Sequence, residues 1–143
     1  MKIVLDTNVL VSGILTPFGP SGEIVRMLFS GELILHLDAR ILSEYQDVLN
    51  RPKFMFNKDQ IAILVDFIKQ YAQFISSSPL NNRLPDPDDE PFLEVAIAGK
   101  VKSLVTGNTA HYPVPLREGI DIYSPSEFIE FCRKQNKGTE PVA

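Results

Sequence analysis

Short apolar runs alternate with longer amphipathic stretches along this chain of 143 residues. Runs of this length are typical of strands that are buried in a parallel sheet, and they lie at residues 3–5, 33–37, 103–106 and 120–123. Helical periodicity is expected at residues 21–30, 39–50, 58–74 and 88–98, and again from residue 125. This alternation predicts an α/β fold: an α/β/α sandwich around a central, mostly parallel sheet of four to five strands.

Capping signals indicate where several of these helices begin. Ser21 is expected to cap the helix at 21–30, and Asp38 the helix that Pro52 ends. Residues 124–127 (Ser-Pro-Ser-Glu) combine a capping box with proline at the first helical position. We expect one domain over residues 1–134, followed by a polar, disordered tail at 135–143.

Composition and charge narrow the possible functions. No apolar run approaches the ~20 residues of a membrane span, and Asp6 interrupts the first run too early for a signal peptide. Cys132 is the only cysteine, which excludes an intrachain disulfide and fits a cytoplasmic protein. The net charge of −4 argues against nucleic-acid binding, unless the acids are gathered around metal ions that reverse the local field.

Asp6 directly follows the first predicted strand. Open α/β sheets bind their ligands at the carboxyl ends of the strands, so Asp6 is expected at a binding edge. A buried, unpaired charge is costly and requires a cation or hydrogen-bond donors. The function therefore depends on whether other acids converge on Asp6.

Two helical acids are candidates for this convergence. Asp89 shares a helix face with the apolar residues Phe92, Leu93 and Ala96, which turns it toward the core. Glu44 lies at the edge of an apolar stripe in its own helix. Each also has a structural explanation: compensation of the helix dipole for Asp89, and a half-exposed helix boundary for Glu44.

The connection after residues 103–106 should border the same edge. Asn108 lies there and can ligate through its amide oxygen or orient a water, or it can simply be a turn residue after Gly107. Neither His36, in a strand, nor His111, in a loop, is expected to be catalytic. The histidines and the single cysteine form no zinc-like pattern.

Four segments follow one another in the order seen in PIN domains: residues 6–12 (DTNVLVS), 42–45 (LSEY), 86–94 (DPDDEPFLE) and 104–108 (LVTGN). The chain resembles prokaryotic PIN-domain proteins of the toxin–antitoxin type, related to VapC-like toxins. Residues 48–54 (VLNRPKF) also resemble this subgroup. The resemblance extends over residues 1–131.

The resemblance implies a cytoplasmic, metal-dependent ribonuclease that hydrolyses phosphodiester bonds of single-stranded RNA. Carried over by position, Asp6, Glu44 and Asp89 are the catalytic acids and the ligands of Mg²⁺ or Mn²⁺, hard ions that prefer carboxylate oxygen. Asn108 stands where the family usually has a fourth acid. The supporting residues are Thr7, Asn8, Ser12, Thr106 and Asn108. An antitoxin protein and a second copy of the chain are the implied partners.

Cations must border an acidic pocket that binds RNA, and Arg51 and Lys53, after the Glu44 helix, are best placed by sequence. A solvated loop explains them equally well. A catalytically inactive PIN-like module that binds RNA or a protein is one alternative function. A Mg²⁺-dependent phosphoaspartyl or receiver-type domain is another, although the acids that it needs beside Asp6 are missing.

Overall fold

The computed structural model describes the backbone of residues 1–139 and the side chains of residues 1–136. Its centre is a five-stranded sheet in the order β3-β2-β1-β4-β5, and every pairing is parallel. The strands are β1 (Lys2–Leu5), β2 (Ile34–Leu37), β3 (Gln73–Phe74), β4 (Ser103–Val105) and β5 (Asp121–Tyr123).

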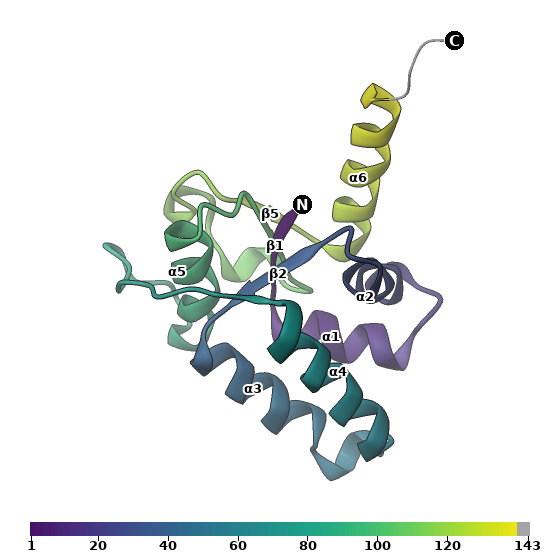
Figure 1. The fold of residues 1–143 in the computed structure, drawn as a ribbon. Coiled ribbons are helices and arrows are strands. Elements are labelled where there is room, and N and C mark those ends of the chain that lie inside the picture. Colours follow the sequence, from purple (N-terminus) through teal and green to yellow (C-terminus); the bar gives the residue numbers. More distant parts are fainter. Residues whose placement is uncertain (140–143) are drawn as a thin grey trace.

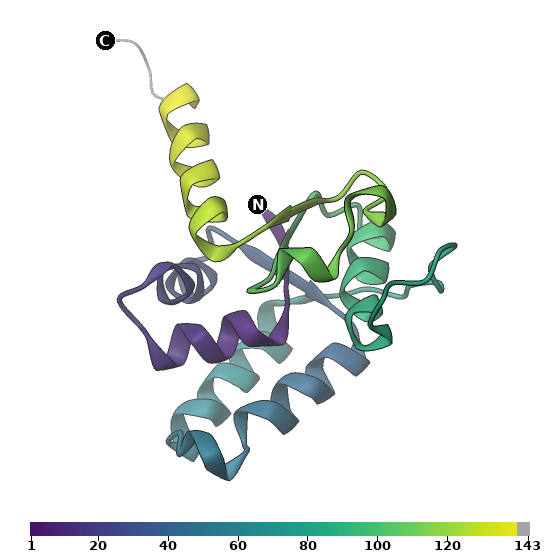
Figure 2. The ribbon, with the colours of Figure 1, turned by 180° about the vertical axis from the view of Figure 1, so that it is seen from behind.

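Helices flank this sheet on both sides. They are α1 (Thr7–Leu15), α2 (Pro20–Ser30), α3 (Ala39–Leu49), α4 (Lys58–Tyr71), α5 (Glu90–Ala98) and α6 (Pro125–Thr139). Helix α5 packs against β1, β2 and β4 on one side, and α1 and α2 lie on the other (Figures 1 and 2). The predicted α/β/α sandwich with a parallel sheet is therefore confirmed.

Strand β1 forms the middle of the core. Ile3, Val4 and Leu5 are completely buried, because β1 has a strand on each edge and helices over both faces. Leu5 pairs with Val105 of β4, so Asp6 and Thr106 leave the sheet side by side. Parallel pairing thus brings the residues that follow β1, β2 and β4 to one edge of the sheet.

Two capping predictions are confirmed. Asp38 accepts a hydrogen bond from the backbone N–H of Ile41 and begins α3. Ser124 and Glu127 bond reciprocally at the start of α6, as a capping box requires. The cap predicted for α2 was wrong. This helix begins at Pro20 after Gly19, and Ser21 is buried inside it.

Other differences concern elements whose local pattern was misleading. Helix α1, which begins directly after Asp6, was not predicted, because its apolar Val and Leu residues resemble a strand rather than an amphipathic helix. Residues 73–74 form β3 instead of ending α4. Helix α6 continues beyond Lys134 to Thr139, into the segment predicted as a polar tail, and residues 140–143 lie outside the described residues. In the described part, no helix has both the length and the apolarity needed to cross a bilayer.

Candidate active site

Asp6 joins two strand ends. Its backbone N–H continues the β1–β4 ladder by donating to the carbonyl of Val105 at 2.9 Å. Its side chain is buried, and Oδ2 accepts a hydrogen bond of 2.9 Å from the hydroxyl of Thr106. Thr106 is itself completely buried, directly after β4. The fold therefore places a carboxylate at the carboxyl edge and holds it from the neighbouring strand.

Asp89 belongs to a different segment of the chain, directly before α5, and lies near the same edge of the sheet. It ends a short 3-10 turn, η2 (Pro87–Asp89), at the entry to α5, whose Phe92 and Leu93 are anchored in the core. The residue is 8% exposed, yet its Oδ2 atom has no hydrogen-bond partner among the described residues. His111 Nδ1 lies 3.2 Å from that atom, within the distance of an ion pair if the imidazole is protonated.

Tyr112 connects the two aspartates. Its hydroxyl lies 3.5 Å from Asp6 Oδ2 and 3.5 Å from the Asp89 carbonyl oxygen, and its ring is completely buried. Burial, and after it the charges of the three predicted acids, raise the pKa of this hydroxyl far above its ordinary value; those acids are Asp6, Asp89 and Glu44. The charges of all three carboxylates therefore act on this one buried hydroxyl.

Glu44 lies half-buried on α3 and receives a short hydrogen bond from the hydroxyl of Thr7. Its neighbour Tyr45 fixes the helix, because the buried phenol donates to the carbonyl of Leu5 at 2.5 Å. The sequence pair Asp6-Thr7 therefore provides one acid and orients another. A cavity of about 150 Å³ opens beside Glu44, lined by Arg40, Ile41, Glu44, Pro87, Asp88, Pro91 and Phe92.

Asn8 and Asn108 have different surroundings. Asn8 Oδ1 accepts a hydrogen bond of 3.0 Å from the backbone N–H of Gly107, which ties the start of α1 to the connection after β4. A Cβ atom at Gly107 would come within 3.3 Å of the Asn8 side chain, so this close approach favours glycine. Asn108 is exposed and contacts the site through its backbone N–H, which donates to Thr106 Oγ1.

Burial destabilises the charged form of both aspartates, and the charge of Asp6 further destabilises that of Asp89. Burial raises the pKa of Asp6, and the hydrogen bond from Thr106 partly offsets this effect. Burial and the charge of Asp6 raise the pKa of Asp89 to about 6, against a smaller opposite effect of His111. Two buried carboxylates with no strong cation beside them form a site whose charge a bound cation would neutralise.

Three predicted site residues lie apart from these acids. Ser12 is half-buried on α1, and its carbonyl accepts hydrogen bonds from the N–H and the hydroxyl of Thr16. Arg51 is seven positions after Glu44, beyond the end of α3 at Leu49, and pairs with Asp47 at 3.3 Å. Lys53 lies over the ring of Phe54, in the turn η1 (Pro52–Phe54). Figure 1 shows this connection at the end of α3 and α4 that points away from α5.

The remaining acids near Asp89 have structural partners. Asp86 caps the backbone N–H of Asp88. Glu90 accepts hydrogen bonds from both Arg83 and the backbone N–H of Leu84, and these lower its pKa. Glu94 pairs with Arg40 at 2.9 Å and accepts from the N–H of Leu80. Glu90 and Glu94 are therefore held by structural partners, and Asp86 is exposed with one oxygen in a cap.

The donors fit a hard divalent ion in part. Within the described residues, no group of three or more His, Cys, Asp or Glu side chains is arranged to hold a metal ion. The site instead offers Asp6 and Asp89, and the Oδ2 atom of Asp89 is buried there without a hydrogen bond. Mg²⁺ commonly binds through one or two carboxylates and keeps several waters, so this pair suits such an ion.

Sequence reasoning missed Tyr112 and assigned no role to His111. Both residues belong to the connection after β4, where His111 ends the short turn η3 (Thr109–His111). Because ligands bind at strand ends, this connection was expected to border the site, but the sequence singled out only its first residues, as far as Asn108. Only the fold of the turn shows which side chains reach back to Asp6 and Asp89.

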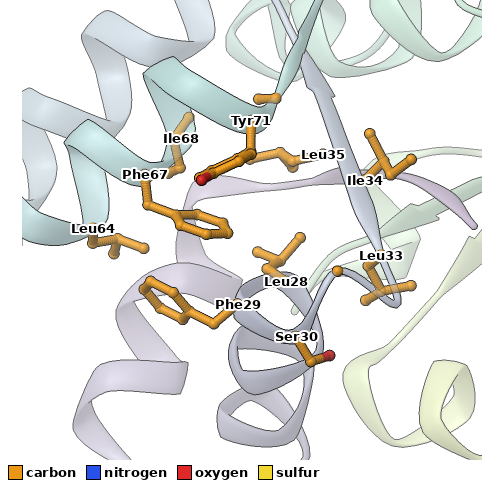
Figure 3. Close-up of a pocket in the computed structure, with 12 residues that line it drawn as sticks. Leu28, Phe29, Ser30, Leu33, Ile34, Leu35, Leu64, Phe67, Ile68 and Tyr71 are labelled. Carbon is orange, nitrogen blue, oxygen red and sulfur yellow. The ribbon is translucent and has the colours of Figure 1, made fainter.

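A second pocket lies away from the acids and is mainly apolar (Figure 3). It has a volume of about 370 Å³ and lies between α2, the amino end of β2 and α4. Phe29 and Tyr71 each contact Phe67 there, with ring centroids 4.6 and 4.7 Å apart respectively. No acid, base or histidine lines it, so it offers no chemistry for catalysis.

The fold and the acids at its carboxyl edge define an α/β protein with a site suited to cations. A family model described as "PIN domain" matches residues 2–110, and the chain belongs to the PIN-domain family. PIN domains are generally nucleases and typically use divalent metal ions. Membership in this family removes the phosphoaspartyl and receiver-type alternatives.

One relative has similar length. The archaeal "Uncharacterized protein MJ1680" of Methanocaldococcus jannaschii is 26% identical over 153 aligned positions, which cover 94% of this chain and 93% of the relative. Its name states no activity. No solved structure matches the chain significantly.

Proposed function

We propose that the protein is a Mg²⁺- or Mn²⁺-dependent endoribonuclease that hydrolyses phosphodiester bonds of single-stranded RNA. The observation that carries this proposal is the buried Asp6–Asp89 pair with one carboxylate oxygen unpaired. An unpaired buried charge is costly, so a fold that retains one at a ligand-binding edge is expected to use it. PIN-family membership supports the choice of a nuclease.

Asp6 and Asp89 would hold one ion in the free protein, with Glu44 bound directly or through a water. When bound, the ion supplies an activated water and neutralises the charge that develops on the phosphate. The chain's own residues fix the acids: Thr106 holds Asp6, and Thr7 holds Glu44. Tyr112 excludes water from behind the pair, because its ring is completely buried. A second ion, if used, arrives with the RNA phosphate, since Asn108 adds no charge.

The biological role proposed here is that of the toxin in a cytoplasmic toxin–antitoxin pair, acting as a homodimer with an antitoxin protein as its partner. This part rests on the resemblance of residues 6–12 and 48–54 to VapC-like toxins. Arg51 and Lys53 remain the proposed RNA contacts. They lie beyond the end of α3, so they can contact only an RNA that extends from the acids along this helix.

Cleavage of a labelled single-stranded RNA by protein free of contaminating nuclease tests the activity. We expect cleavage with Mg²⁺ or Mn²⁺, none with EDTA, and none by Asp6→Asn under any condition. Glu94→Gln is a matched control, because Glu94 is a buried acid on the same segment whose partners are structural. Equal activity of Asp6→Asn and wild type would refute the proposed site.

A second function has one specific observation in its favour. The fourth acid is replaced by Asn108, and the net charge is −4, which fits a PIN-like module that binds RNA or a protein without cleaving it. Binding of RNA without cleavage at saturating Mn²⁺ would favour this function. Activity gained by Asn108→Asp would then identify the missing charge as the reason.

A further inference from the structure

The connection after β4 brings His111 to the acids, not Asn108. His111 Nδ1 lies 3.2 Å from Asp89 Oδ2, the one buried side-chain oxygen without a hydrogen bond among the described residues. Asn108, three positions earlier, is exposed and contacts the site only through its backbone N–H. The donor nearest to the unpaired oxygen is therefore an imidazole nitrogen.

Several hydrogen bonds fix the turn that carries this imidazole. The backbone N–H of His111 donates to the carbonyl of Asn108 at 3.0 Å. Arg117 clamps the turn by donating to the carbonyls of Tyr112, at 2.7 Å, and Thr109, at 3.4 Å. The next residue, Tyr112, is buried against both aspartates. A ring that is 45% exposed is thus held at the mouth of the site, with one side toward Asp89 and another toward solvent.

We propose that His111 supplies a nitrogen ligand to the metal ion of this site, in place of the fourth family acid. This inference rests on the metal site of the proposed function. A neutral imidazole adds a donor without adding negative charge to two carboxylates that already repel each other. It also changes the metal preference, because imidazole nitrogen strengthens binding of transition metals more than it strengthens binding of Mg²⁺. The site should therefore prefer Mn²⁺ to Mg²⁺.

A simpler role would be that His111 only stabilises the charge of Asp89 as an exposed partner. The two roles differ in what the substitution His111→Gln does to metal binding. Loss of a ligand weakens Mn²⁺ binding and removes nitrogen from the coordination sphere. Loss of a charge partner leaves Asp89 more available and either does not change or strengthens the binding of every divalent ion.

Pulsed electron paramagnetic resonance on the Mn²⁺-loaded protein tests the assignment directly. The chain has two histidines, and His36 is held in β2 by the carbonyl of Ile34. The ring of His36 lies beside Gly99: a Cβ atom there would be 3.3 Å from it. Gly99 follows α5 at the end opposite to Asp89, about 14 Å away along the helix axis. We expect a histidine nitrogen coupling that changes on ¹⁵N-histidine labelling, is lost in His111→Gln and persists in His36→Gln.

Calorimetric titration with Mn²⁺ and with Mg²⁺ provides the second readout. His111→Gln should weaken Mn²⁺ binding at least tenfold, a loss that removal of even an outer-shell partner typically causes. Mg²⁺ binding should change little. Mn²⁺ binding without a nitrogen coupling, or an equal change for both ions, would overturn the role of His111 and leave the proposed nuclease site intact. No Mn²⁺ binding by wild type would overturn both.

Discussion

Asp89 and Glu90 are neighbours in the chain, and each is 8% exposed, yet their surroundings differ completely. Glu90 is satisfied: Arg83 donates to both of its oxygens and Leu84 donates to one. Asp89 has an unpaired oxygen, the like charge of Asp6 nearby, and a raised pKa of about 6. Hydrogen bonds from Leu84 and Arg83 lower the pKa of Glu90, whereas burial and the charge of Asp6 raise the pKa of Asp89.

The comparison teaches that the partners of a buried acid reveal more than its burial. A carboxylate that hydrogen bonds and a cation fully satisfy holds the structure together, as Glu90 holds the loop before it. A carboxylate left unpaired costs stability in the free protein and is retained where a ligand satisfies it. By this criterion Glu90 and Glu94 are structural acids, whereas Asp89 belongs to the proposed site together with the buried Asp6, whose charge acts on it.

The largest expected effect that separates the two groups is on catalysis. Asp6→Asn and Asp89→Asn should each lower RNA cleavage by at least about 100-fold, roughly 3 kcal/mol of transition-state stabilisation, because each removes a proposed metal ligand. Glu94→Gln should retain cleavage per folded molecule, since the polar partners of Glu94 are Arg40 and the N–H of Leu80 rather than the site acids. Comparable losses in all three variants would remove the distinction between the groups.

The next effect is on folding stability, where substitution of the structural acid should cost more than substitution of the site acid. Glu94→Ala should lower the free energy of unfolding by about 1–3 kcal/mol, because it leaves the N–H of Leu80 without its acceptor and removes the bridge to Arg40. Asp89→Asn should leave the metal-free protein equally or more stable at neutral pH, since it removes repulsion from Asp6. Urea denaturation of both variants measures this. Unfolding of Asp89→Asn would make Asp89 a structural acid.

The sequence predicted the position of Asp6 better than it separated Asp89 from the structural acids Glu90 and Glu94. The α/β/α sandwich and the strand-end position of Asp6 followed from short apolar runs, which reveal buried parallel strands without any knowledge of tertiary contacts. The inward phase of Asp89 was less informative than expected. Helix α5 is buried on almost every side, so Glu90 and Glu94 are buried as well. Their arginine partners are distant in sequence or lie in a loop, and no local pattern shows them.

Helix α1, strand β3 and the role of the turn after β4 also depend on tertiary structure. A helix that is buried on most sides has no polar stripe, and a two-residue strand exists only because β2 offers its edge. His111 and Tyr112 reach the site because Arg117 folds their turn back. Such contacts between distant residues cannot be derived from spacing alone.

A smaller effect should appear in the pH dependence of the metal-free protein. Since the pKa of Asp89 is about 6, above its ordinary 3.8, the folded state binds this proton more tightly than the unfolded chain. The resulting stability is fully present below about pH 4 and lost as pH rises through about 6. Asp89→Asn cannot titrate, so its stability relative to wild type should rise by about 1–3 kcal/mol between pH 4 and pH 7. A difference that stays constant across this range would contradict the raised pKa.

The smallest effect concerns the proposed RNA contacts at the end of α3. Replacing both Arg51 and Lys53 with Gln should weaken RNA binding and flatten the dependence of log K on log salt by at most about 1.4, because each phosphate contact to a single strand contributes about 0.7. Arg51 already pairs with Asp47, which reduces its share. Binding of an RNA to an inactive Asp6→Asn background at several salt concentrations provides the measurement. An unchanged slope would place the RNA backbone elsewhere.

The central claim is that Asp6 and Asp89 are buried close together, and that one oxygen of Asp89 lacks a hydrogen bond, because a divalent ion binds between them. Urea denaturation at neutral pH, with and without Mn²⁺, tests it without any assumption about the RNA. Wild type should gain about 2.7 kcal/mol when Mn²⁺ is present at 100 times its dissociation constant, while Asp6→Asn and Asp89→Asn gain little and Glu94→Gln gains as much as wild type. No gain in wild type, or an equal gain in all four proteins, would contradict the account.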